Sequence, residues 1–283
     1  MNPRSLIERA EKLTAPSPAV VKLLDFLNRS EVDNDEILAV VRKDPVLCCK
    51  LLATCNSPAY GLSSQVGSLD QAVLYLGSQV IYRLVLALSF GPSLTRKLGG
   101  YAIDGQDLWK HSLLAGTLTS KVIEAMPRSN FEPSVAYTAG LIHDIGKILM
   151  NQALDNKTKE AIQKIIEGQG LSLLEAERAV LKTDHAEVGA HLLQLWKLPE
   201  IVIEAVANHH APVIHPHPKL SSVIHVANVL AHGAGSTPGW SSFAVRAHEE
   251  VPEALGLNET AMQCLALESF DALAQVEQMA ASK

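Results

Sequence analysis

Histidine and aspartate side chains gather in the second half of the chain, and their chemistry suits a metal centre. The chain has 11 histidines, and the first of them is His111. An adjacent pair, His143 and Asp144, stands in the stretch GLIHDIGK, with Lys147 close behind. Neutral imidazole together with carboxylate suits iron, manganese, nickel or zinc. A His-Asp pair alone is a weak signal, so its meaning depends on which other histidines can reach it.

Other histidines lie on apolar helical faces or at the ends of apolar helices, where they could converge. These candidates are His111, His185, His209, His210 and His225. Burying so many imidazoles without a common partner would cost free energy, and a metal ion supplies that partner. Such centres are commonly built from facing helices of a bundle. The pattern therefore predicts a divalent transition metal (Fe, Mn, Ni or Zn), as one or two ions.

The remaining histidines have positions that do not suit ligation, and we expect them at the surface or the boundary. They are His191, His215, His217, His232 and His248. Lys147 follows His143 by one helical turn and has two open interpretations. It is either a plain surface lysine or a cation that steadies an anionic group, such as a phosphate, near the metal.

The segments that must position these side chains all have helical period. Capping patterns mark several helix starts, at Ser68 with Gln71, at Ser172 with Glu175, and at Asp184 with Glu187. A long terminal helix is expected from Asn258. No alternating strand or hairpin turn stands out. The sequence therefore predicts an all-α fold.

Two stretches interrupt the helical pattern and suggest how the chain is organised. Residues 91–106 are glycine-rich and poorly periodic, which favours a connection between two lobes. Residues 233–258 form a second long irregular stretch before the last helix. We expect an N-terminal helical lobe over residues 1–98. A second lobe with the metal-site residues and the C-terminal helix is expected over residues 99–283.

Composition limits the location and the partners. Hydrophobic residues make up 47% and charged residues 19% of the chain, which favours a folded globule. The net charge of −6 disfavours broad binding to nucleic-acid phosphates, so no nucleic-acid partner is expected. The apolar stretch after Arg83 is far shorter than a membrane span. The 4 cysteines form no CxxC pair and are expected to be reduced and buried. These features predict a cytoplasmic protein without a membrane association.

The order of these residues, a lone His, the His-Asp pair, a further His and a His-His pair, resembles the HD superfamily of metal-dependent phosphohydrolases. Its HDOD branch is more similar still, from about Leu13 to about His232. The stretches that carry this resemblance are LTAPSPAVVKLL, VVRKDPVLCCKLLATCNSPAYG, SLDQAVLYLG, LWKHSLLAG, AGLIHDIGKILM, DHAEVGAHLLQLWKLP and VANHHAP. The resemblance implies a two-lobed helical bundle of HDOD type with an HD-like second lobe. It also implies a bacterial protein of signal transduction or regulation.

The same resemblance assigns roles to individual residues. The metal ligands that it implies are His111, His143, Asp144, His185, His209 and His210. In a hydrolase, Asp144 would bridge two ions and Lys147 would stabilise phosphate charge. The related HD-GYP branch, which hydrolyses cyclic-di-GMP, uses a late aspartate and a glycine-tyrosine-proline loop. Here Asn228 stands in place of that aspartate and the loop is absent, so cyclic-di-GMP hydrolysis is not expected.

Three functional hypotheses remain open at this point. The first is a regulatory module that acts by binding a signalling protein partner or a small phosphorylated ligand, as a monomer or homodimer. The second is an active metal-dependent phosphohydrolase on a phosphoester or nucleotide, in which Asp144 and Lys147 are the catalytic residues. The third is a purely structural helical module. Metal content separates the third from the others, and metal-dependent turnover separates the first two.

Overall fold

The computed structural model describes residues 18–26, 33–42, 45–63, 66–94, 105–239 and 247–281. Within these ranges every regular element is a helix and there is no strand, which confirms the all-α prediction. The N-terminal helices are α2 (Pro18–Asp25), α3 (Asn34–Arg42), α4 (Pro45–Cys55), η2 (Pro58–Tyr60), α5 (Leu69–Leu76) and α6 (Ser78–Leu94). The same ranges contain no helix both long and apolar enough to cross a membrane.

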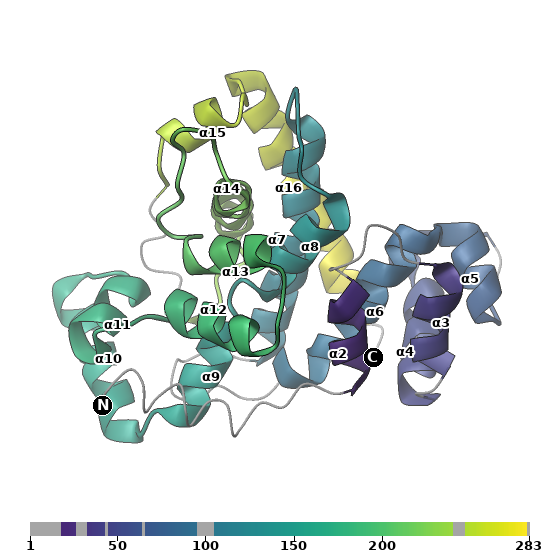
Figure 1. Cartoon of the computed structure of the whole chain (residues 1–283), viewed down its shortest axis with the longest axis horizontal. Coiled ribbons are helices and arrows are strands. Elements are labelled where there is room, and N and C mark those ends of the chain that lie inside the picture. The colour runs from purple at the N-terminus through teal and green to yellow at the C-terminus, as the bar shows by residue number, and fades with distance from the viewer. Residues whose placement is uncertain are drawn as a thin grey trace.

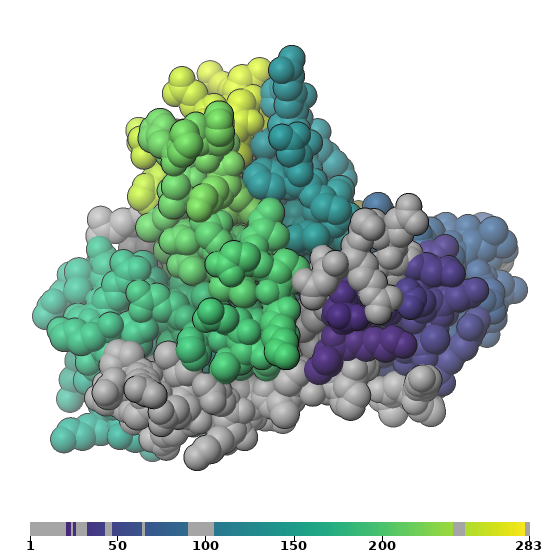
Figure 2. All heavy atoms as spheres, viewed as in Figure 1, coloured from purple at the N-terminus to yellow at the C-terminus, as the bar shows by residue number. Residues whose placement is uncertain are grey.

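The described residues from 105 onward form ten further helices. They are α7 (Gly105–Ala125), α8 (Pro133–Ile142), α9 (Ile145–Ala153), α10 (Asn156–Gln169), α11 (Leu173–Leu181), α12 (His185–Leu195), α13 (Glu200–Ala207), α14 (Leu220–Gly233), α15 (Glu250–Ala254) and α16 (Glu259–Ala281). Figure 1 shows α3 to α5 at one end of the molecule, α9 to α11 at the other, and α7, α8, α13 and α14 between them. The space-filling view shows the same division by colour (Figure 2).

The two halves meet through α6 and α16. Helix α6 packs against α7, α8 and α9, and α16 packs along α7 and α14 and reaches η2. At that contact, the hydroxyl of Tyr60 lies 3.7 Å from the sulfur of Met279. The predicted boundary between residues 98 and 99 lies outside the described residues and stays a prediction.

The capping patterns begin helices where the sequence predicts them. Ser172 and Glu175 form a reciprocal capping box at the start of α11. The side chain of Asp184 accepts a hydrogen bond from the backbone N–H of Glu187 and begins α12 at His185. The side chain of Asn258 accepts a hydrogen bond from the N–H of Ala261 and begins α16. Each cap satisfies an N–H group that the helix itself leaves without a partner.

Two close helix crossings depend on glycine. A Cβ at Gly146 of α9 would lie 1.8 Å from the carbonyl oxygen of His185, so no side chain fits where α9 meets α12. A Cβ at Gly140 of α8 would lie 2.3 Å from Oγ1 of Thr119 in α7. Both glycines flank the His143–Asp144 pair, so the close packing brings this pair against α7 and α12.

Several details of the sequence prediction were wrong. Residues 91–94 belong to α6, and α15 interrupts the stretch predicted to be irregular. Of the cysteines, Cys55 is buried, but Cys49 and Cys264 are exposed. The local sequence pattern does not determine which face of an apolar helix is buried, because burial depends on tertiary packing.

Candidate metal centre

Asp144 lies at the centre of a buried group of histidines. It occupies the junction between α8 and α9, directly after His143. Its Oδ2 lies 3.4 Å from Nε2 of His143 and 3.8 Å from Nε2 of His111. Its Oδ1 lies 3.5 Å from Nε2 of His185 and 3.8 Å from Nε2 of His209. The carboxylate thus faces four imidazoles, two on each oxygen.

Separate helices supply these imidazoles. His111 lies on α7, His185 is the first residue of α12, and His209 and His210 follow the end of α13. Nε2 of His210 lies 2.9 Å from Nε2 of His185. Most of these histidines lie at or next to helix termini. A side chain there can point into a space that the neighbouring helices enclose.

The side chains form two sets that share Asp144. One set is Asp144 with His185, His209 and His210, and the other is Asp144 with His111 and His143. Within each set the possible ligand atoms all lie within 4.8 Å of one another. A carboxylate has two oxygens to share, so the arrangement has places for one ion or for two.

The outer nitrogen of each central imidazole is held by an acceptor. Nδ1 of His143 lies 2.7 Å from the carbonyl oxygen of Gly140, and Nδ1 of His209 lies 2.7 Å from that of Val206. A carbonyl oxygen can only accept, so the proton is on Nδ1 and the lone pair of Nε2 faces Asp144. This is the arrangement in which proteins present histidine to a metal.

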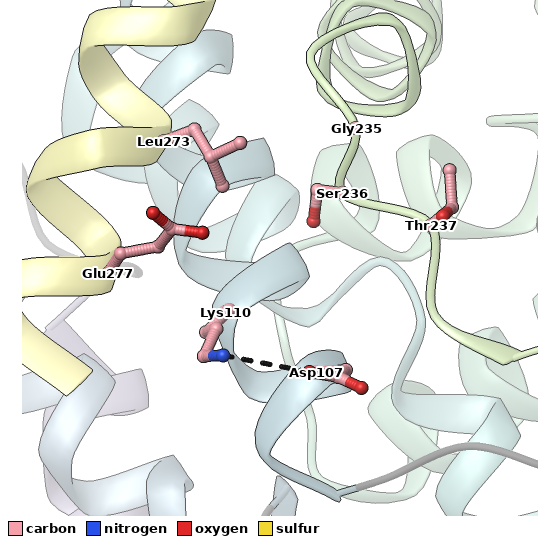
Figure 3. A pocket seen from close by; sticks show the side chains of 7 residues that line it. All are labelled: Asp107, Lys110, Gly235, Ser236, Thr237, Leu273 and Glu277. Carbon is pink, nitrogen blue, oxygen red and sulfur yellow. Dashed lines mark ion pairs between the residues drawn. The ribbon is translucent and has the colours of Figure 1, made fainter. Parts of the chain in front are cut away.

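His185 and His111 are anchored in the same way by different acceptors. Oε2 of Glu177, a buried residue of α11, lies 2.7 Å from Nδ1 of His185 and also accepts the backbone N–H of His185 at 2.9 Å. Nδ1 of His111 lies 3.1 Å from the carbonyl oxygen of Ser236, in the turn after α14. Ser236 also lines a hollow of about 240 Å³ between α7 and α16, which Figure 3 shows from close by.

Several inward-facing atoms of the centre are buried without a hydrogen-bond partner in the described part of the chain. They are Nε2 of His111, His143 and His209 and Oδ1 of Asp144. A buried polar atom without a partner costs free energy, and native proteins rarely keep several together. One or two metal ions bound by the two sets would satisfy these atoms. The donor set of imidazole and carboxylate fits a divalent transition metal.

The electrostatics of the centre keep His111 and His209 neutral and the carboxylate of Asp144 charged. Burial lowers the pKa of His111 and of His209 well below the usual value for histidine. Burial alone would raise the pKa of Asp144, but His143 and the ammonium of Lys147 outweigh it and hold this pKa well below its ordinary value. Neutral imidazole and ionised carboxylate are the protonation states that bind a metal.

Lys147 is part of the centre. Its ammonium donates a hydrogen bond of 2.6 Å to Oδ2 of Asp144, and its side chain is almost completely buried. Of the two interpretations that the sequence left open, the structure therefore excludes the plain surface lysine.

Comparison with known proteins decides the family. The HDOD domain family matches residues 13–212 of this 283-residue chain. The chain belongs to the HDOD family. A proposed signal-transduction protein from Marinobacter aquaeolei has a solved structure with a TM-score of 0.81 and 20% identity, covering 99% of this chain and 64% of that one. A proposed phosphohydrolase from Shewanella amazonensis has a TM-score of 0.74 and 22% identity, covering 98% and 97%. At this level of identity, both show the HDOD fold alone.

Curated relatives are longer than this HDOD chain. An uncharacterised protein of Treponema pallidum is 24% identical over 264 residues, which are 89% of this chain and 47% of the relative. Ribonuclease Y of Enterococcus faecalis is 30% identical over 152 residues, 51% of this chain and 22% of that protein. The chain thus spans about half the length of the first relative and about a fifth of the second.

The HDOD structure brings together the six residues that the resemblance implied as ligands: His111, His143, Asp144, His185, His209 and His210. His225 lies outside both sets, and its Nδ1 lies 2.9 Å from the carbonyl oxygen of His209. It therefore positions the turn that carries His209 and His210. His215 and His217 are exposed and His191 is partly buried, in line with the surface or boundary positions expected for them.

His232 of α14 is partly buried, in line with the surface or boundary position expected for it. Its contact with the metal centre was not predicted: its ring centroid lies 4.9 Å from that of His111. The helical spacing could have indicated a place near the other histidines, because His232 lies two turns after His225 on the same face of α14. Asn228, between them on this face, is buried, and its Oδ1 has no hydrogen-bond partner within the described ranges.

Proposed function

We propose that this HDOD protein is a bacterial, cytoplasmic regulatory protein whose second lobe binds a phosphorylated small molecule at a divalent transition-metal centre. His111, His143, Asp144, His185, His209 and His210 would hold one or two ions. The single observation that carries this proposal is the convergence of unpartnered, buried imidazole nitrogens on the Asp144 carboxylate.

The ion would attract phosphate oxygens and make a bound water more acidic. The protein's own residues prepare the site for such a ligand. Gly140, Val206, Ser236 and Glu177 fix the orientation of the imidazoles through their outer nitrogens. Lys147 supplies a cation beside Asp144, and a phosphate oxygen can take the place of the carboxylate as its partner.

The regulatory part of the proposal rests on the family and on one structural relative. The relative from Marinobacter aquaeolei is named as a proposed signal-transduction protein. In this account the ligand bound at the metal centre changes how the protein contacts a signalling partner, as a monomer or a homodimer.

The experiment is a thermal-shift screen of metal-loaded, untagged protein. The ligands are orthophosphate, mononucleotides, cyclic dinucleotides and a short RNA, the last because several relatives are named Ribonuclease Y. We expect at least one phosphorylated ligand to raise the melting temperature in the presence of metal. The rise should be absent in D144N and kept in H217A, whose histidine is exposed. If no phosphorylated compound stabilises the metal-loaded protein, the proposal is wrong.

Hydrolysis of the bound phosphoester is the second candidate function. It is favoured by the shared position of Asp144 between two sets of ligand atoms, which would let two ions act on one phosphate. Asp144 would bridge the ions and Lys147 would stabilise charge on the phosphate. Steady-state assays on the same compounds test it, with K147M as the informative variant. Metal-dependent turnover that K147M reduces at least about tenfold supports hydrolysis, and its absence leaves binding as the function.

A further inference from the structure

His232 is an imidazole beside the metal centre that the ligand set does not use. It lies in the last two turns of α14, and its ring is in contact with the ring of His111. It belongs to neither set of possible ligand atoms. Unlike His111, which is completely buried, His232 is only partly buried. Its ring therefore lies at the edge of the buried centre and is partly open to solvent.

The His232 ring can donate a hydrogen bond whether it is neutral or protonated, because an imidazole carries one N–H when neutral and two when charged. Its place against the ring of His111 puts this donor at the edge of the centre.

No hydrogen bond to the His232 ring is made by the described residues. The other imidazoles around the centre each have a fixed partner on their outer nitrogen or a contact with another imidazole nitrogen. His232 thus differs from them in having a ring nitrogen available for a ligand. One turn before it, Asn228 presents a second polar side chain on the same face of α14.

We propose that His232 is a substrate-positioning residue that donates a hydrogen bond to a non-bridging oxygen of the phosphate group bound at the metal centre. This inference rests on the proposed function and identifies one contact between the protein and the bound phosphate. Lys147 and His232 would then approach the same phosphate from α9 and α14.

The test compares two variants of His232 for binding of inorganic phosphate by calorimetry, using full-length, metal-loaded protein. H232L keeps about the same volume but removes the N–H, and we expect phosphate affinity to fall about tenfold, the effect of one hydrogen bond to a charged group. H232Q keeps an amide N–H, and we expect affinity within about threefold of the wild type. H217L, at an exposed histidine, is the matched control and should bind like the wild type.

Metal content is measured on the same samples, because His232 also contacts His111. We expect H232L and H232Q to retain as much metal as the wild type. If H232L loses metal, His232 acts by supporting His111, and the inference is overturned. It is also overturned if phosphate binds H232L as tightly as the wild type, a result that leaves the proposed function intact. If the metal-loaded wild type binds phosphate compounds in no assay, both the inference and the proposed function fail.

Discussion

Four imidazoles at the centre are fixed through the outer ring nitrogen, namely those of His111, His143, His185 and His209. For His143 and His209 the acceptor is a backbone carbonyl three residues earlier, at Gly140 and Val206. The orientation of these rings is therefore set by the end of the preceding helix. His185 depends instead on a distant side chain, Glu177 of α11. A substitution at Glu177 can therefore remove the side-chain acceptor that orients the ring of His185.

The E177Q substitution tests this support. The amide keeps the shape of Glu177 but lacks its negative charge, so it holds the Nδ1 proton of His185 less strongly. We expect metal affinity to fall about 10- to 100-fold, the usual effect of losing an outer partner of a metal-bound histidine. Competition with a metal indicator measures it. E160Q, at an exposed position of α10, is the control. Equal affinity in E177Q and the wild type would show that Glu177 does not tune the centre.

At the scale of elements, the centre depends on how closely α9 approaches α12. The N-terminal turn of α9 carries Gly146, and this glycine lies against the backbone of His185. The approach brings Asp144, just before α9, within 3.5 Å of Nε2 of His185. Any side chain at position 146 must move one of the two helices.

The G146A substitution is therefore expected to be strongly destabilising. The added methyl would overlap the carbonyl oxygen of His185, and we expect a loss of about 3 kcal/mol in the free energy of unfolding, at the upper end for overpacking. Urea denaturation measures it. G168A is the matched control, since nothing lies within 4 Å of a Cβ at Gly168 in α10. It should stabilise the protein by about 0.5–1 kcal/mol. A loss no larger than about 0.5 kcal/mol in G146A would contradict the described packing.

The elements that can be predicted well from the sequence are those marked by residues close together in the chain. Ser172 with Glu175 and Asp184 with Glu187 mark helix starts because the capping partners are three residues apart. The six ligand-type residues could be selected because their order resembles a known family. The contact of His232 with His111 could not be predicted with equal ease, because it joins α14 to α7 across more than a hundred residues. The exposure of Cys49 and Cys264 likewise depends on which helix faces find neighbours.

At the scale of the whole molecule, the buried histidines make stability depend on pH. Folding lowers the pKa values of His111 and His209 well below the value of about 6.5 expected in the unfolded chain. Below pH 6.5 the unfolded chain therefore takes up protons that the folded protein does not. The stability of metal-free protein is complete above this pH and falls as the pH decreases towards the folded pKa values.

We expect the urea midpoint of metal-free protein to fall steadily between pH 7.5 and pH 5. The H217A variant should show the same decrease, because the exposed His217 is solvated in both states. In H209L the urea midpoint should fall less over this pH range, because the variant lacks one of the buried imidazoles that cause the fall. A midpoint that is constant or rises over this pH range would mean that the imidazoles are not held neutral by burial.

The central claim is that the side chains around Asp144 hold a metal. The most direct measurement is a crystal structure of untagged, metal-saturated protein, with the ion located by its anomalous scattering. The account predicts at least one ion bound by Asp144 and by inward-facing nitrogens of His111, His143, His185, His209 or His210. An empty centre at saturating metal, or an ion held only by exposed residues such as His215 and His217, would contradict it.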